Sequence, residues 1–181
     1  MPTTRTGTVT TYTVPSLAAS GGVGAMLRVV MYDDGLARDF KPRLQRALFV
    51  SYRARTPAPG FDSGLPLVWD QRVFLHQYDG VAVPRADPWT TPTYLLGLLD
   101  AAEGVVTAIP GEPLPVRRSW VYTPLNQINA NLRPDLVAKA GSLGSLNISF
   151  VAKNGTHGTF SVCRFVALTE SGNDCSDGVD N

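Results

Sequence analysis

The chain has 181 residues, 44% of them hydrophobic, and a formal net charge of +1 at pH 7. This length suits one domain that buries a substantial apolar core, and the two cysteines are too few for a disulfide framework. The near-neutral charge argues against nucleic acid or an anionic membrane surface as the main partner. No apolar run reaches the roughly 18 residues that a membrane span needs. The N-terminal segment lacks the apolar stretch of a signal peptide, so a secretion signal would lie outside this sequence.

Short segments rich in Val, Ile, Thr and aromatic residues recur along the chain and predict β-strands. They cover residues 8–14, 25–31, 47–54, 73–78, 120–122, 146–151 and 159–168. Alternation places Leu146, Ile148 and Phe150 on an inward face, and it places Leu48, Val50 and Tyr52 together on one face of their strand. The spacing predicts an all-β fold, an antiparallel β-sandwich of jelly-roll type, with one or two short helices in the connections.

The connections carry their own signals. A helix is predicted from Pro92, capped by Thr91 and stopped by Gly104, because its leucines recur at helical spacing. A second, weaker helical pattern covers residues 134–140, and the proline-rich residues 110–115 suggest a linker. The Gly21-Gly22 pair suggests a hairpin turn.

The last residues differ in kind from the rest. We expect a β-sandwich domain over residues 1–168, followed by an acidic, cysteine-containing tail over residues 169–181. Close-spaced carboxylates around Gly178 suggest a Ca²⁺ loop, but the closing Glu is missing. The tail is therefore predicted to be disordered or to be the truncated start of a further module.

The residue types of common active sites are sparse. A zinc protease needs two histidines one helical turn apart with a Glu between them, whereas His76 and His157 lie far apart in the sequence. Ser63 lacks the preceding glycine of a nucleophile elbow. A Ser-His-Asp triad assembles in space, so a hydrolase site in the loops stays open. The sequence motifs predict no catalytic residue and no metal ligand.

Two kinds of surface chemistry remain. Asn147-Ile148-Ser149 and Asn154-Gly155-Thr156 are N-glycosylation sequons, and Asn154 is the stronger candidate because a hairpin tip is open to a glycan. Trp69 and Trp89 are candidate sugar-stacking aromatics, although tryptophans of this kind more often serve packing.

Residues 47–53, Ala-Leu-Phe-Val-Ser-Tyr-Arg, are followed by Gly-Phe-Asp-Ser-Gly-Leu at residues 60–65. This pair of segments resembles the C-terminal part of the gametolysin family, the extracellular zinc metalloproteases of volvocine green algae. Similar pieces follow in the same order at residues 11–16, 24–29, 72–78 and 159–164. The resemblance covers roughly residues 8–168 and is strongest over 24–78 and 146–164.

The resemblance implies an accessory or structural β-sandwich of a secreted metalloendopeptidase that acts on cell-wall and extracellular-matrix glycoproteins. The family's zinc motif has no counterpart among the 181 residues, so zinc belongs to the parent family and no cofactor is expected in this chain. The expected partners are a protease domain, other extracellular domains, or cell-wall glycoprotein or polysaccharide, with no nucleic acid and no membrane. Cys175 would pair with a cysteine outside this sequence or with Cys163. The alternative is a stand-alone matrix or carbohydrate-binding module.

Overall fold

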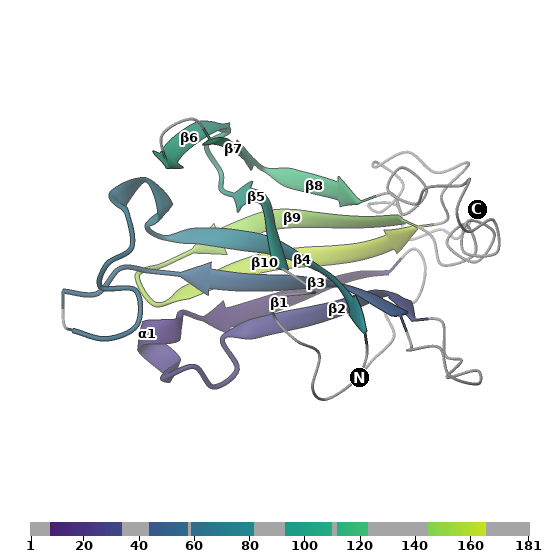
Figure 1. Ribbon diagram of the computed structural model, residues 1–181, viewed down its shortest axis with the longest axis horizontal. Helices are drawn as coiled ribbons and strands as arrows, with labels where there is room; N and C mark the ends of the chain where they lie inside the picture. Colours follow the sequence, from purple (N-terminus) through teal and green to yellow (C-terminus); the bar gives the residue numbers. More distant parts are fainter. Residues whose placement is uncertain are drawn as a thin grey trace.

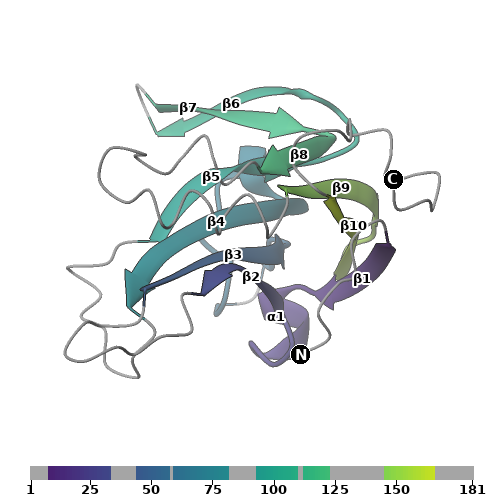
Figure 2. The same cartoon turned by 90° about the vertical axis from the view of Figure 1, so that its right-hand side faces the viewer.

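The computed structural model describes residues 8–33, 44–57, 59–81, 93–109, 112–122 and 145–165. The strands form two sheets, one of four strands and one of six, which lie as two facing layers (Figure 1, Figure 2). This arrangement confirms the all-β sandwich predicted from the sequence. None of the helices in the described ranges has the length and apolar character needed to cross a membrane.

The four-stranded sheet is fully antiparallel. Its order is β1 (Val9–Pro15), β10 (His157–Phe165), β9 (Ser145–Lys153) and β8 (Ser119–Tyr122). β9 and β10 form a hairpin, and Asn154 N donates to His157 O across its turn at 2.9 Å. The hairpin tip predicted at Asn154-Gly155 is therefore confirmed.

The six-stranded sheet is antiparallel except for one short contact. Its order is β2 (Met26–Asp33), β3 (Leu44–Arg53), β4 (Arg72–Val81), β5 (Thr93–Leu99), β7 (Glu112–Arg117) and β6 (Gly104–Ile109). β5 and β7 run parallel and pair only at Leu98–Val116 and Leu99–Arg117. A 3₁₀ turn, η1 (Leu67–Trp69), interrupts the long connection from β3 to β4.

Two connections carry the chain between the sheets. The short helix α1 (Leu17–Ser20) leads from β1 to β2; Ser16 Oγ caps it by accepting from Ala19 N at 3.1 Å, and Gly21 ends it at φ 61°. The second crossing lies between β7 and β8. Asp100 N donates to Arg117 O at 3.0 Å in one sheet, and Phe150 N donates to Arg118 O at 2.8 Å in the other. The chain therefore passes from the six-stranded sheet to the four-stranded sheet at Arg117-Arg118.

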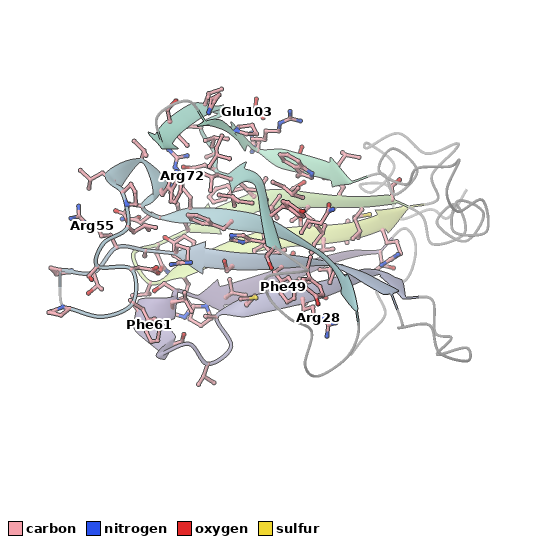
Figure 3. The ribbon with its side chains drawn as sticks, viewed as in Figure 1. Arg28, Phe49, Arg55, Phe61, Arg72 and Glu103 are labelled. Carbon is pink, nitrogen blue, oxygen red and sulfur yellow. The ribbon has the colours of Figure 1, made fainter. Side chains whose placement is uncertain are left out.

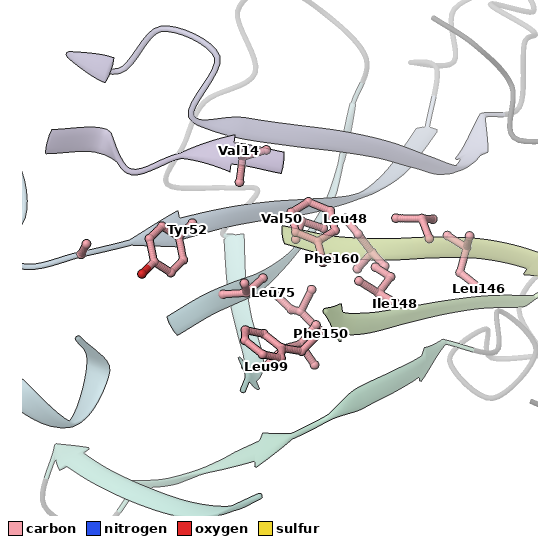
Figure 4. Close-up of a cluster of buried hydrophobic side chains, with 13 residues drawn as sticks. Val14, Leu48, Val50, Tyr52, Leu75, Leu99, Leu146, Ile148, Phe150 and Phe160 are labelled. Carbon is pink, nitrogen blue, oxygen red and sulfur yellow. The ribbon is translucent and has the colours of Figure 1, made fainter. Parts of the chain in front are cut away.

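The inner core fills the space between the sheets (Figure 4). It comprises Val14, Leu48, Val50, Tyr52, Ala54, Val73, Leu75, Leu99, Leu146, Ile148, Phe150, Phe160 and Val162. The core includes the three side chains predicted to face inward on β9 and the three predicted to share a face on β3, with exposures of 0% to 8%. Because each large apolar side chain contributes about 1.5–3 kcal/mol on full burial, this cluster is the main source of stability.

Tyr52 is the largest fully buried side chain of the inner core. Its hydroxyl donates to Asn154 O at 2.6 Å, so the polar end of the ring is satisfied. A Cβ at Gly158 would overlap the Tyr52 ring. Only glycine therefore fits where the hairpin passes over this ring.

A second apolar cluster lies on the other side of the six-stranded sheet. Leu65, Phe74, Leu98 and Val116 are buried there, with Trp69, Leu95 and Val106 packed against them. The loop after β3 and the β6–β7 pair provide most of its cover. The C-terminal end of β5 is therefore buried on both faces, with Leu98 and Leu99 each 0% exposed.

This double burial explains why the helix predicted from Pro92 is wrong. Residues 93–99 are strand β5, and a strand covered on both faces has a continuous apolar sequence that mimics a helical pattern. A register shift between Leu75 and His76 disturbs the simple alternation further. The proposed helix at residues 134–140 lies outside the described residues.

Two turn predictions also need correction. The Gly21-Gly22 turn is no hairpin, because β1 and β2 belong to different sheets. The predicted linker at residues 110–115 overlaps β7, which holds Pro113 and Pro115. Proline has no backbone N–H to donate to a neighbouring strand. A segment with two prolines is therefore not predicted to be a strand, even where one forms.

Candidate functional site

The two histidines lie on opposite outer surfaces of the sandwich. Val73 and Leu75 of β4 face the inner core, so His76 faces away with Phe74, outside the six-stranded sheet. On β10, Gly158 faces Tyr52, so His157 faces outside the four-stranded sheet. The inner core lies between the two rings, and they cannot bind one metal ion.

The residues around each histidine do not fit the family's zinc centre either. Within the described ranges, no three His, Cys, Asp or Glu side chains come close enough together to hold a metal ion. Thr156 Oγ1 lies 2.8 Å from Nδ1 of His157, so the hairpin itself occupies that ring nitrogen. The zinc ligands of the family therefore cannot be assigned to His76 or His157.

His76 belongs to a stack that also includes the Phe74 ring and the Arg53 guanidinium. Its imidazole lies parallel to Phe74, with ring centroids 6.1 Å apart, and the Arg53 guanidinium lies 5.7 Å from the Phe74 centroid. Burial, and secondarily the positive charge of Arg53, lower the pKa of His76 below its ordinary value of 6.5. The ring is therefore neutral at neutral pH and acts as a packing group here.

The loop after β3 is fastened to this stack by an ion pair. Arg53 Nε and Nη2 both donate to Asp62 Oδ1, and the Asp62 side chain is 0% exposed. Asp62 itself has φ 66°, a conformation that Asp adopts more readily than most residues. Its Oδ2 is buried without a hydrogen-bond partner. The pair holds residues 59–65 against the sheet.

Beside this stack the six-stranded sheet presents a half-buried outer surface. We define the outer face as Met26, Arg28, Phe49, His76 and Tyr78. Arg28 and Phe49 pair across β2 and β3, Phe49 and His76 across β3 and β4, and Figure 3 shows Arg28 beside Phe49. Phe49 meets Tyr78 edge-on with centroids 6.4 Å apart. Met26 is 52% exposed, and the Arg28 Nε is buried without a partner.

Aromatic, methionine and arginine side chains of this kind are enriched in protein interfaces. The outer face therefore provides apolar contact area with cationic hydrogen-bond donors, which suits binding of another molecule.

A buried carboxylate closes one end of the sandwich. Asp100 Oδ2 accepts from Arg72 Nη1 at 2.9 Å, and both of its oxygens lie 2.9 Å from Lys153 Nζ. Arg72 lies on β4 and Lys153 on β9, so the cluster ties the two sheets together. Burial, followed by the charges of Asp70 and Asp100, raises the pKa of Tyr52 to about 12. All groups of this cluster are mutually paired, which indicates a structural role.

Comparison with known proteins now bears on this geometry. The family model of Gametolysin peptidase M11 matches residues 2–109 of the chain. The chain belongs to the gametolysin family. No curated protein and no solved structure matches the chain significantly.

The gametolysin match runs from before β1 to the end of β6. It therefore includes the outer face and the Arg53–Asp62 pair, but only one of the two histidines. Proteins of the gametolysin family are generally extracellular metalloproteases. The sequence of this member nevertheless lacks the paired histidines and intervening glutamate of a zinc protease motif.

The structure places the two sequons in different settings. Asn147 lies on β9 between β8 and β10 and is half-buried, with its Oδ1 accepting from Ser149 Oγ at 3.2 Å. Asn154 is exposed at the turn of the β9–β10 hairpin. Whether either residue carries a glycan stays a prediction at this point.

Of the other candidate residues, the structure describes Cys163 and Trp69. Cys163 is buried on β10 at 3% exposure, whereas Cys175 lies outside the described residues, so their pairing stays a prediction. Trp69 packs edge-on against Phe74, with centroids 5.9 Å apart, in the second apolar cluster. Trp89 and the acidic tail at 169–181 also lie outside the described residues.

Sequence reasoning missed the polar residues that organise this structure. Asp100 and Lys153 carry no motif, and they come from segments distant in sequence. The Arg53–Asp62 contact alone left a signal, because both residues belong to the segments that carry the family resemblance.

Proposed function

We propose that this chain is an accessory β-sandwich of a gametolysin-type metalloendopeptidase that acts on cell-wall or extracellular-matrix glycoproteins. In this proposal the protein is extracellular and related to the volvocine algal enzymes that its motifs resemble. The sandwich holds the enzyme on its glycoprotein matrix, and the catalytic zinc and base belong to a protease domain. The sandwich itself contributes binding rather than bond cleavage.

One observation carries the proposal. The chain belongs to a metalloprotease family, yet its two histidines lie on opposite surfaces with the inner core between them. When bound, zinc would polarise a peptide carbonyl and activate water, which requires three protein ligands and one further coordination position left open. Two histidines that cannot meet are unable to form that centre.

The outer face supports a binding role. It combines the half-buried rings of Phe49 and Tyr78 with the guanidinium of Arg28 on neighbouring strands. The inner core and the Asp100 cluster keep these strands rigid, and rigid presentation lowers the entropy cost of binding.

The proposal is tested by offering the purified chain a hydroxyproline-rich matrix glycoprotein, with and without added zinc. Retention and cleavage are measured on the same sample. We expect retention without cleavage, and weaker retention for Arg28→Ala and Phe49→Ala. Val121→Ala, an exposed position on the other sheet, is the matched control and should leave retention unchanged.

Two results would contradict the proposal. Cleavage that a zinc chelator abolishes would make the chain itself the protease. Absence of retention would remove the matrix-holding role. Retention that free sugar competes away, and that Trp69→Ala or Trp89→Ala weakens, would instead indicate the carbohydrate-binding module.

A further inference from the structure

The turn of the β9–β10 hairpin holds Asn154 in one fixed geometry. Its Oδ1 accepts three hydrogen bonds, from Thr156 N at 2.9 Å, Thr156 Oγ1 at 3.1 Å and His157 N at 2.8 Å. The side chain thereby caps the turn through its oxygen alone. The Nδ2 atom makes no hydrogen bond to the described part of the chain.

The turn is also anchored to the rest of the sandwich. Tyr52 Oη donates to Asn154 O at 2.6 Å, and Ser16 N, at the cap of α1, donates to Thr156 O at 2.7 Å. Asn154, Gly155 and Thr156 are nevertheless all exposed. The backbone of the turn is fixed by buried groups, while its side chains project into solvent.

We propose that Asn154 carries an N-linked glycan and that Asn147 does not. The class of donor is a lipid-pyrophosphate-linked oligosaccharide of the secretory pathway. The Nδ2 of Asn154 forms a bond to C1 of the first sugar as the bond from C1 to the pyrophosphate oxygen breaks. The lipid pyrophosphate leaves with the electron pair, and Nδ2 loses one of its two protons.

The folded chain accommodates this change at Asn154 without losing a contact. All three hydrogen bonds of the side chain end on Oδ1, which the modification leaves as it is. A Cβ placed on the neighbouring Gly155 would meet nothing within 4 Å, so the space above the turn is open.

Asn147 has the opposite surroundings. It is half-buried on an inner strand, directly opposite Cys163 on β10 and Val121 on β8. Cys163 is only 3% exposed, so the surface beside Asn147 is covered on the β10 side, whereas Val121 on the β8 side is 50% exposed. Asn147 therefore offers a sugar less open space than Asn154, whose turn residues are all exposed.

A glycan at the hairpin would keep the end of the sandwich that holds α1 in solvent (Figure 1). The outer face lies on the six-stranded sheet, away from the sheet that carries Asn154. The glycan would therefore leave the outer face free for a partner.

The test is to secrete the full chain from a eukaryotic host and measure its intact mass before and after enzymatic glycan release. Asn154→Asp is the decisive variant, because it keeps the Oδ1 acceptor and removes the nitrogen. We expect one glycan on the unaltered chain, complete loss in Asn154→Asp and Thr156→Ala, and retention in Asn147→Asp and Thr156→Ser. Release should also convert Asn154 to Asp in the recovered peptide.

A mass without glycan on the unaltered chain, or a glycan that disappears in Asn147→Asp, would overturn the proposal. A second glycan on Asn147 would overturn its selectivity. Chain made in bacteria, with and without Asn154→Asp, should melt at the same temperature, which separates loss of the acceptor from loss of the fold. The inference rests on the extracellular location in the proposed function. Because secretion is imposed in this experiment, its failure would leave the accessory role standing.

Discussion

The inner core and the outside of the six-stranded sheet are both apolar, but they differ in how fully other parts of the protein cover them. The buried side chains of the inner core are at most 8% exposed, and its one buried tyrosine has its hydroxyl satisfied by Asn154 O. The outside of the six-stranded sheet is only partly covered, and the Arg28 Nε and Asp62 Oδ2 are buried there without partners. The comparison indicates that the inner core determines the fold, whereas the outer face is available to contact something else.

The two regions should differ most in how much the free energy of unfolding falls when a phenylalanine is replaced by alanine. Phe160→Ala in the inner core should lower the free energy of unfolding by about 3–5 kcal/mol, because it opens a cavity at a 0% exposed site. Phe49→Ala on the half-buried outer face should cost less than half as much. Urea unfolding measures both, and equal losses would remove the distinction between the regions.

A smaller effect tests the tight packing at Tyr52. Gly158→Ala should destabilise the chain by about 1–3 kcal/mol, because the new methyl group would overlap a fully buried ring. Gly155→Ala, three residues away in open space, is the matched control and should change stability little.

The same pair of positions can be tested by compensation. Combining Gly158→Ala with Tyr52→Leu should cost less than the sum of the two single changes, since the smaller side chain makes room for the methyl group. Strict additivity in thermal melts would show that the ring does not determine the requirement for glycine.

The smallest effect concerns how the stability of the protein depends on pH through His76. Because the pKa of His76 is lowered on folding, the unfolded chain binds a proton more readily below its ordinary pKa of 6.5. Stability should therefore fall as the pH drops from 6.5 toward the lowered pKa of the folded state. His76→Gln should weaken this fall between pH 7.5 and 5.5, whereas His157→Gln on the other sheet serves as the control. Identical melting profiles for His76→Gln and the unaltered chain would contradict the assignment.

The sequence predicts the strands that are buried on one face. Alternation in β3 and β9 groups six inner-core residues correctly, because polar residues mark the opposite face. β5 defeats this reasoning, since both of its faces are apolar, and β7 defeats it through Pro113 and Pro115. These local errors do not affect the motifs that carry the family resemblance, because the motifs depend on residue identity rather than on the alternation of apolar and polar residues.

The candidate site is less predictable than the fold. The sequons and the separation of the histidines in sequence can be read directly, but the opposite placement of His76 and His157 depends on which sheet each strand joins. The same holds for Asp100 with Lys153, whose pairing is set by tertiary contacts. Local sequence patterns do not specify which distant residues become partners in the fold.

The central point of the proposal is that zinc belongs to a protease domain rather than to this chain, whose sequence lacks the paired histidines and glutamate of a zinc protease motif. Its most direct test is the zinc content of the purified chain after equilibration with one equivalent of the ion, together with the melting temperature before and after chelation. We expect no stoichiometric zinc and no change in melting temperature, for the unaltered chain and for His76→Ala alike. One tightly bound zinc per chain, lost on His76→Ala or His157→Ala and needed for full thermal stability, would contradict the account.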